Sequence, residues 1–344
     1  MLTDTVLALR EQSVSLAEEI SRLHYARQGR FWNPYGDTGW QKSMRDITYH
    51  LMYLIEAIEA DDAGLFTEYV AWVHGLFQGL HFPEDTLRIT LECMQTALKQ
   101  YPQAQPILLA ALQVLETPLT DTILFVQPQS RLGELAQTYL NYLLSGKRYL
   151  ASELILEAAR NGTPIPDLYL NVFQPVQREI GRLWHANQIS VAREHYCTAA
   201  TQMIMSQLYP YIFGGERKGP HVVVACVGGE LHEIGARMVA DFFEMHGWNT
   251  TFLGANTPVS EVLHAMQLWN AQLLALSVTM TFHVGQARDL IRQLRTSPVL
   301  AHLPVMVGGY PFNLAPDLWR TIGADGYSYD ASGAITEAQR LLNL

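Results

Sequence analysis

The sequence predicts a multi-domain α plus α/β protein, with an N-terminal all-helical domain, a four-helix bundle and a doubly wound α/β domain of the Rossmann or flavodoxin type. Three observations lead to this fold class. The 344 residues are enough for two or three domains. Up to residue 213, apolar residues recur every three or four positions, which is the helical period. After residue 220, short apolar runs alternate with amphipathic segments of helical length, as in a parallel sheet covered by helices on both faces.

The first predicted domain spans residues 1–129 and is all-helical. Its helical spacing continues to about Thr117, without strand-like runs of alternating apolar residues. The turn-forming segment Gly29–Gly39 interrupts the pattern, and Pro83 followed by two acidic residues begins a further helix. Residues 118–129 hold two prolines around an extended apolar run, so we expect them to connect this domain to the next.

The second predicted domain spans residues 130–213 and has the pattern of four helices with short connections, as in a bundle. The helices are separated at Gly146, at Asn161–Pro166 and at Asn187–Ser190, where the serine can cap the following helix. The polar segment Gly214–Pro220 is then predicted to be a linker.

The third predicted domain spans residues 220–344. Five short apolar runs suit buried parallel strands: HVVVACV, TTFLG, LLALSVT, PVMVGG and GYSYD. Ligands of doubly wound domains bind at the carboxyl ends of the strands, so the side chains that follow these runs are the first candidates for a site.

Composition limits the classes of function. Lys and Arg total 23 and Asp and Glu total 33, a net charge of −10 without a basic cluster, so nucleic acid is not an expected partner. With 49% hydrophobic and 16% charged residues, we expect a homo-oligomer or a bulky ligand. The three cysteines lie far apart, unlike those of a zinc knuckle or a redox dithiol. We recognise neither a signal peptide nor an apolar run long enough to span a membrane, and expect a cytoplasmic protein.

His232 lies on the loop after the first predicted strand, at the ligand-binding edge of the sheet. A loop histidine taken alone is more often an ordinary surface residue. Here it belongs to the pattern Glu230-x-His232-x-x-Gly235. The carboxylate can hold one ring nitrogen and leave the other free for a metal, and the glycine lets a bulky group approach the start of the helix.

Two further elements follow strands of the same domain, Ser277-Val278-Thr279 and Gly308-Gly309. With the histidine pattern they resemble, in order and spacing, the cobalamin-binding domain of methionine synthase, corrinoid proteins and adenosylcobalamin mutases. The resemblance covers Pro220–Leu344 and implies that His232 is the lower cobalt ligand, with the nucleotide tail in a slot lined by the Ser-x-Thr and Gly-Gly segments. Glu230 stands where Asp is commoner, and its longer carboxylate can still reach the imidazole. The acidic cluster of a receiver domain and the Gly-x-Gly-x-x-Gly turn of a dinucleotide fold are missing.

The bundle carries a pattern of its own at the junction of its last two helices. Trp184 and His185 are followed by the pair Glu194 and His195, with nine residues between Trp184 and Glu194. In an isolated bundle these would be a core tryptophan and a solvated pair. Ahead of a cobalamin domain, the pattern resembles the cap of adenosylcobalamin-dependent light-sensing regulators. The resemblance implies that the tryptophan packs against the adenosyl group and that the Glu and His contact it.

This second resemblance also implies a mechanism. Light breaks the cobalt–carbon bond of adenosylcobalamin, the cap helices shift, and His185 takes the vacated upper cobalt position. Cobalt accepts imidazole well, so such a site is chemically reasonable. The shift of the cap would bias an assembly equilibrium, so we expect a light-dependent homo-oligomer.

Residues 1–130 do not resemble the DNA-binding domain of those regulators, because they are longer, acidic and rich in aromatic residues. The segments MRDITYHLMYLIEAI and LFTEYVAWVHGLF instead resemble the N-terminal domain of photocobilins, which bind adenosylcobalamin and the bilin biliverdin. The candidate bilin contacts are Arg45, Tyr49, His50 and Trp72. Each of them also fits ordinary helix packing.

The mode of chromophore binding in this domain stays open. Cys93 is expected on the buried side of a helix, which favours noncovalent binding of a bilin. A haem held by His50 or His74 is the alternative chromophore.

We therefore predict a cobalamin-dependent photoreceptor, with a bilin that extends the absorbed wavelengths and a downstream protein partner. The alternatives are a corrinoid methyl carrier for a methyltransferase and a light- or cobalamin-dependent transcriptional anti-repressor that binds another protein. A nucleophile elbow, a P-loop and a zinc-protease helix are missing, so we do not expect an enzyme.

Overall fold

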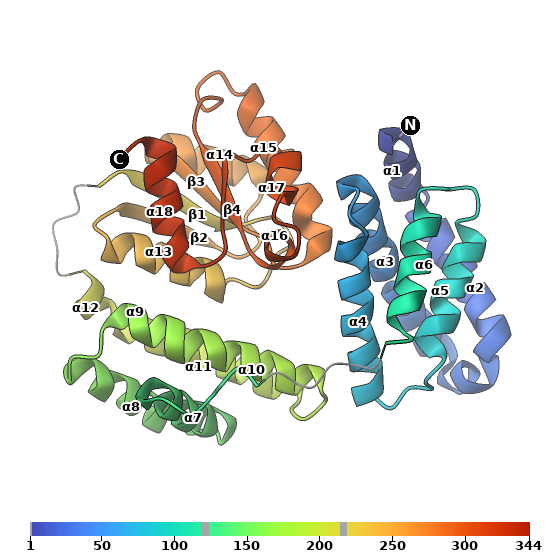
Figure 1. Ribbon diagram of the computed structural model, residues 1–344, viewed down its shortest axis with the longest axis horizontal. Coiled ribbons are helices and arrows are strands. Elements are labelled where there is room, and N and C mark those ends of the chain that lie inside the picture. Colours follow the sequence, from blue (N-terminus) through green and yellow to red (C-terminus); the bar gives the residue numbers. More distant parts are fainter. Residues whose placement is uncertain (1, 118–123, 214–218) are drawn as a thin grey trace.

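The computed structural model describes residues 2–117, 124–213 and 219–344 (Figure 1). Most of the predicted connection, 118–123, and most of the predicted linker, 214–218, lie outside the described residues. The fold class is confirmed, with two helical regions and one parallel sheet covered by helices. Within the described parts of the chain, every helix is too short or too polar to cross a membrane.

The N-terminal region is helical throughout, as predicted. Its helices are α1 (Leu2–Glu11), α2 (Ser13–Trp32), α3 (Gly36–Ala60), α4 (Ala63–Gly79), α5 (Thr86–Ala97) and α6 (Ala104–Val114). The interruption expected over Gly29–Gly39 is present as a kink with non-helical backbone at Gln28 of α2, followed by the 3₁₀ turn Asn33–Tyr35, whereas Gly36–Gly39 already belong to α3. Asp62 caps α4 by accepting a hydrogen bond from the N–H of Gly64 at 2.7 Å.

The second helical region forms the predicted cap of four helices. Its elements are α7 (Arg131–Leu144), α8 (Arg148–Arg160), α9 (Ile165–Leu168) with the π-turn Tyr169–Phe173 leading into α10 (Gln174–His185), then α11 (Val191–Gln207) and the short α12 (Tyr209–Ile212). The predicted breaks hold residues with positive φ, which end a helix: Gly146, Gly162 and Asn187. Ser190 caps α11 as predicted, accepting from the N–H of Arg193.

The third region is a five-stranded parallel sheet in the order β2-β1-β3-β4-β5, with helices on both faces. The strands are β1 (His221–Cys226), β2 (Asn249–Gly254), β3 (Leu273–Ser277), β4 (Val305–Gly308) and β5 (Gly326–Ser328). The helices are α13 (Ile234–Met245), α14 (Val259–Leu268), α15 (Val284–Thr296), α16 (Tyr310–Leu314), α17 (Leu318–Thr321) and α18 (Ala331–Leu342). All five strands were predicted, and the strand order reverses between β1 and β3, where such folds bind ligands.

The sheet separates two apolar cores because successive side chains of a strand point to opposite faces. On β1, Val222 and Val224 belong to the core that includes the cap, whereas Val223 and Ala225 belong to the core that continues into the N-terminal helices. The cap also rests on α13, where the hydroxyl of Tyr169 donates to Asp241 at 2.8 Å.

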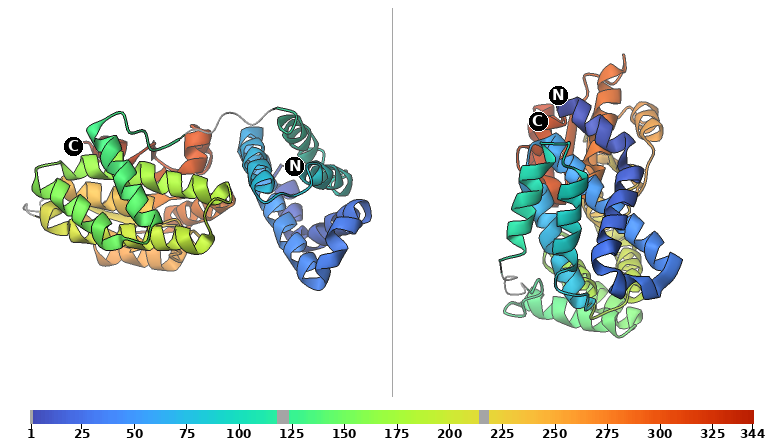
Figure 2. Two further views of the ribbon diagram at one scale, coloured as in Figure 1. Left: turned by 90° about the horizontal axis from the view of Figure 1, so that it is seen from below. Right: turned by 90° about the vertical axis from the view of Figure 1, so that its right-hand side faces the viewer.

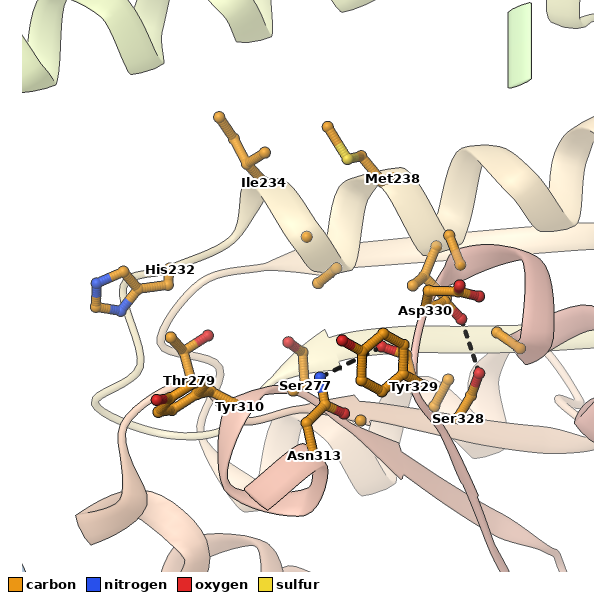
Figure 3. A pocket seen from close by; sticks show the side chains of 18 of the residues that line it. His232, Ile234, Met238, Ser277, Thr279, Tyr310, Asn313, Ser328, Tyr329 and Asp330 are labelled. Carbon is orange, nitrogen blue, oxygen red and sulfur yellow. Dashed lines mark hydrogen bonds between the residues drawn. The ribbon is translucent and has the colours of Figure 1, made fainter. Parts of the chain in front are cut away.

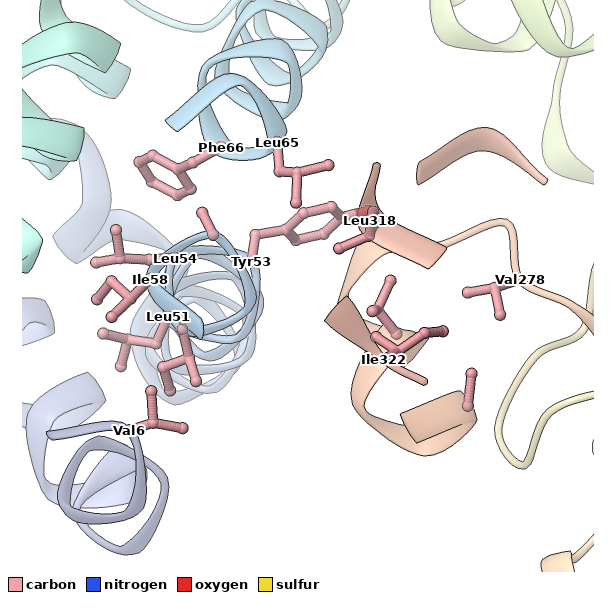
Figure 4. Close-up of a cluster of buried hydrophobic side chains, with 14 of the residues drawn as sticks. Val6, Leu51, Tyr53, Leu54, Ile58, Leu65, Phe66, Val278, Leu318 and Ile322 are labelled. Carbon is pink, nitrogen blue, oxygen red and sulfur yellow. The ribbon is translucent and has the colours of Figure 1, made fainter. Parts of the chain in front are cut away.

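The N-terminal helices pack beside the α/β domain and against one end of the cap (Figures 1 and 2). Tyr53 of α3 points toward the α/β domain (Figure 4), where its ring lies 5.3 Å from that of Phe282. An ion-pair cluster adds to this contact, in which Arg288 of α15 pairs with Glu59 of α3 at 2.5 Å. The N-terminal domain therefore contacts the segment that directly follows β3, at the ligand-binding edge of the sheet.

Candidate functional site

A cavity of about 490 Å³ lies between the cap and the carboxyl ends of the strands (Figure 3). Six residues singled out from the sequence line it: His232, Gly235, Ser277, Thr279, Gly308 and Gly309. The cap contributes side chains that the sequence analysis did not identify: Leu170, Gln174, Gln177 and Arg178. Three separate loop motifs and one face of the cap helix thus meet at a single cavity.

The imidazole of His232 is held by Glu230. The distance from Nδ1 to the carboxylate Oε1 is 2.6 Å, and the backbone N–H of His232 donates to the same oxygen at 3.1 Å. Because a carboxylate only accepts, the proton lies on Nδ1 and the lone pair on Nε2. The hydrogen bond to Glu230 raises the pKa of His232. The result is an oriented imidazole whose Nε2 is available as a metal ligand.

The second oxygen of Glu230 ties this loop to the segment after β3. Oε2 accepts from the N–H of Thr279 at 2.8 Å, from the N–H of Met280 at 2.9 Å and from Nδ1 of His283 at 3.2 Å. Burial of this fully enclosed carboxyl would raise its pKa, but the hydrogen bonds from both imidazoles and the backbone hold the pKa of Glu230 well below its usual range. A buried anion therefore fixes the imidazole of His232.

Two glycines of the cavity act in opposite ways. A Cβ built on Gly235 would meet nothing within 4 Å, so this glycine leaves open space beside the start of α13. Gly309 has φ +114°, and a Cβ there would lie 1.9 Å from the carbonyl oxygen of Val278. The first glycine keeps room for a ligand, and the second allows β3 and β4 to end close together.

The four cap residues predicted to face the upper ligand do not line this cavity. Trp184 and His185 end α10 and lie against Trp72 of α4, with ring centroids 6.2 Å and 4.9 Å from the Trp72 indole, respectively. Nε2 of His185 is 2.7 Å from the backbone oxygen of Trp72. Glu194 and His195 lie in the first turn of α11 and contact each other at 2.5 Å. The sequence predicted all four at one end of the cap, but it did not indicate the contact of Trp184 and His185 with the N-terminal domain.

The other candidate bilin contacts have different surroundings. His50 is buried, where its Nδ1 lies 2.8 Å from the hydroxyl of Tyr69, and burial lowers its pKa to about 4. Tyr49 lies 5.6 Å from Phe282 of the α/β domain, and Arg45 is exposed. The structure thus does not gather them at one cavity, and their role in bilin binding stays a prediction.

Cys93 and His74 were the remaining N-terminal candidates. Cys93 is buried on α5, as expected, and burial raises the pKa of its thiol. His74 lies on α4 near Gln78, with Nε2 3.3 Å from the amide nitrogen. A thiol with a raised pKa is a poor nucleophile, which agrees with the expected noncovalent mode of binding.

Comparison with known proteins gives matches to the α/β domain and to the cap. Two family models, each described as a B12 binding domain, match residues 220–336 and 135–209. Dimethylamine corrinoid protein 3 of Methanosarcina mazei is 32% identical over 122 residues, which are 35% of this chain and 71% of that protein. The chain belongs to the family of B12-binding corrinoid proteins. The predicted cobalamin-binding domain and its helical cap are confirmed at this level.

The other similarities agree with this assignment. Dimethylamine corrinoid protein 3 of Methanosarcina acetivorans is 31% identical over 130 residues, which cover 38% of this chain and 60% of that protein. The chain therefore spans well under the full length of that relative. The solved structure of the monomethylamine corrinoid protein of Methanosarcina barkeri has a TM-score of 0.54, covers 61% of this chain and 99% of its own, and shares the fold at 21% identity.

The residues of the cavity fit a corrinoid. His232 presents a free Nε2 lone pair, as a lower cobalt ligand requires, and Gly235 leaves space next to it. The Ser277–Thr279 and Gly308–Gly309 segments bound a deep apolar slot beside the strands, suited to a nucleotide tail. Glu230 was predicted to hold the histidine, and its additional bond to His283 was missed because that residue lies 53 positions away.

Proposed function

We propose that this corrinoid protein is a cobalamin-dependent photoreceptor whose cap responds to the loss of the upper cobalt ligand. The observation that carries the proposal is the gathering of Trp184, His185, Glu194 and His195 at one end of the cap. The first pair ends α10, the second lies in the first turn of α11, and only residues 186–190 separate the two helices. Their spacing is the one that resembles the cap of adenosylcobalamin-dependent light-sensing regulators.

In this function the chain holds the cobalt from below and senses it from above. His232, fixed by Glu230, would hold the cobalt from below, and the slot beside β3 and β4 would take the nucleotide tail. Bound adenosylcobalamin supplies a cobalt–carbon bond that visible light breaks. His185 would be the residue to hold the cobalt once the adenosyl group has left, and releasing its contact with α4 would let the cap change its contacts with another copy or a downstream protein. Biliverdin in the N-terminal domain, as a second chromophore, rests on the resemblance to photocobilins alone.

A second candidate is a corrinoid methyl carrier for a methyltransferase, and the comparisons favour it. The curated relatives are named dimethylamine corrinoid proteins, which supports methyl carriage more directly than light sensing. In a methyl carrier, His232 would again be the lower cobalt ligand and Glu230 would orient it. The cap would open toward the partner enzyme, and His185 would not be a ligand. In neither function is the chain by itself an enzyme, and that prediction remains to be tested.

The two functions are separated by the product of illumination. Free adenosylcobalamin also reacts to light, so the informative quantity is which ligand the cobalt carries afterwards. In the wild type we expect the absorption spectrum of cobalt with an imidazole as its upper ligand, and the same spectrum in the control His302→Ala, whose exposed histidine lies between α15 and β4. His185→Ala should give the spectrum of the water-ligated product.

Two outcomes would exclude the photoreceptor: no spectral change under green light, or the same product spectrum in His185→Ala and the wild type. The methyl carrier predicts instead that methylcobalamin-loaded protein loses its methyl group in the dark when a corrinoid-dependent methyltransferase and its thiol acceptor are added.

A further inference from the structure

The N-terminal domain contacts the end of the cap through one face of α4. Trp72, Gly75 and Gly79 are three and four residues apart and therefore share this face. Opposite them lies the cap segment 184–187, which holds the last two residues of α10 and the start of the turn to α11. We call this contact between α4 and residues 184–187 the α4–cap contact.

The two glycines allow this contact to be close. A Cβ on Gly75 would lie 2.7 Å from Cε1 of His185, and a Cβ on Gly79 would lie 3.2 Å from the carbonyl oxygen of the same histidine. Asn187, on the turn, donates from its side-chain amide to the backbone oxygen of Gly79 at 3.2 Å. A side chain at either glycine would therefore push the cap end away.

The hydrogen bond within this contact engages the nitrogen that would bind cobalt. Nε2 of His185 lies 2.7 Å from the backbone oxygen of Trp72, and a carbonyl oxygen only accepts. The imidazole thus carries its proton on Nε2. Before Nε2 can bind a metal, it must leave the carbonyl and give up that proton, with the ring proton then on Nδ1.

Helix α4 is itself attached to the α/β domain. The hydroxyl of Tyr310, which follows the Gly-Gly segment, donates to Glu68 at 2.8 Å, one turn before Trp72. The opposite end of the cap is attached to α13 through the hydrogen bond between Tyr169 and Asp241. The cap is therefore fixed to the α/β domain directly at one end and through α4 at the other.

We propose that α4 is a latch on the cap, in which Trp72, Gly75 and Gly79 hold His185 away from cobalt and set how fast it becomes the upper ligand. The latch rests on the proposed function because it concerns His185 as a cobalt ligand. It assigns to the N-terminal domain a task that is independent of any chromophore bound there.

The step controlled by the latch is a ligand exchange. Starting from hydroxocobalamin, whose upper ligand at neutral pH is water or hydroxide, the Nε2 lone pair of His185 forms a bond to cobalt. The water leaves; where the upper ligand is hydroxide, it takes up a proton from the solvent and leaves as water, while the imidazole keeps its one ring proton on Nδ1. Cobalt stays in the +3 state, and no electrons are transferred.

The test uses the full chain with hydroxocobalamin in the dark. It follows the rate at which the absorption spectrum of cobalt with an imidazole as its upper ligand appears. Gly75→Ala should accelerate this rate by about fivefold or more, the effect of losing roughly one hydrogen bond. Asn187→Gly should act in the same direction from the cap side, and it keeps the positive φ of 55° at that position, so it should fold. Gln78→Ala, an exposed change on α4, should leave the rate unchanged, and His185→Ala should never give the spectrum.

The latch is wrong if Gly75→Ala and Asn187→Gly both exchange at the wild-type rate or more slowly, or if no variant shows a spectrum that depends on His185. A second readout needs no cobalt. In the cobalamin-free protein, the ¹⁵N signals of His185 should report a protonated Nε2 in the wild type and a changed tautomer distribution in Gly75→Ala. An absent light response would remove the photoreceptor but not these results, because the exchange occurs in the dark.

Discussion

In the proposed photoreceptor, the lower and upper sides of the cobalamin site are built in different ways. Below, His232 is fixed within one domain by Glu230, a fully buried carboxylate that accepts five hydrogen bonds from backbone and imidazole donors. Above, His185 is held by one hydrogen bond to a backbone oxygen of another domain. In the proposed function, the permanent ligand would be preorganised by a buried network, whereas the switching ligand would be held at a domain contact that small changes can release.

The largest effect should come from removing the lower ligand. We expect His232→Ala to weaken cobalamin binding by more than about 100-fold, because loss of an outer partner of a metal-bound histidine alone costs about 10- to 100-fold. His185→Ala should change the affinity by less than about threefold, since that imidazole is engaged elsewhere in the resting state. Equilibrium dialysis with adenosylcobalamin in the dark, where the adenosyl group and not His185 is the upper ligand, measures both, and equal losses in the two variants would contradict the asymmetry.

The next effect concerns the buried carboxylate. Glu230→Gln keeps the shape of the side chain but replaces one acceptor oxygen with an NH2 donor. This donor then lies against the N–H groups of Thr279 and Met280 or against the Nδ1–H of His232, all of which need an acceptor. We expect a loss of cobalamin affinity of about 10- to 100-fold and a decrease of about 2 kcal/mol in the free energy of unfolding. Urea titration of the cobalamin-free protein measures the second quantity. An unchanged unfolding free energy would show that the network does not preorganise His232.

The two glycines of the cavity should separate binding from folding. Gly235→Leu fills open space, so the unfolding free energy should change little while cobalamin affinity falls by about tenfold or more, from the cost of overpacking. Gly309→Ala should instead lose about 3 kcal/mol of stability, because a Cβ meets the backbone of Val278 at a φ that favours glycine. If both variants bind and unfold alike, the cavity does not hold the corrinoid.

The smallest predicted effect lies at the fixed end of the cap. Burial, only partly offset by Tyr169 and Arg237, raises the pKa of Asp241 to about 6. Because the folded protein then binds this proton more tightly than the unfolded chain, the contribution of Asp241 to stability is present below about pH 4 and is lost as the pH rises through 6. Asp241→Asn should therefore become more stable relative to the wild type by about 1 kcal/mol between about pH 5 and pH 7.5 in urea titrations.

A constant difference in unfolding free energy between Asp241→Asn and the wild type across this pH range would contradict the raised pKa.

The sequence predicted most of the lower side and little of the upper. The strands, the helix breaks and the cavity residues His232, Gly235, Ser277 and Gly309 were identified because each motif is local and parallel strands end at the same edge. His185 was identified from its spacing, but its contact with Trp72 was not, since 113 residues separate them and helix packing between domains has no periodic signal.

The same limit applies to the cap side of the cavity. Gln174, Gln177 and Arg178 lie on one face of α10 and line the cavity, yet polar residues on a helix equally indicate a solvent-facing surface. Only the packing of the cap over α13 distinguishes the two cases.

Both proposed functions require His232 as the lower cobalt ligand, and one spectrum tests this directly. Protein labelled with ¹⁵N only in histidine is loaded with cobalamin, which is reduced to the Co(II) state for electron paramagnetic resonance. We expect the superhyperfine splitting from the lower nitrogen to change from the triplet of ¹⁴N to the doublet of ¹⁵N, and this doublet to vanish in His232→Ala. A triplet that persists in the labelled wild type would mean that the nucleotide base of cobalamin, and not His232, binds the cobalt.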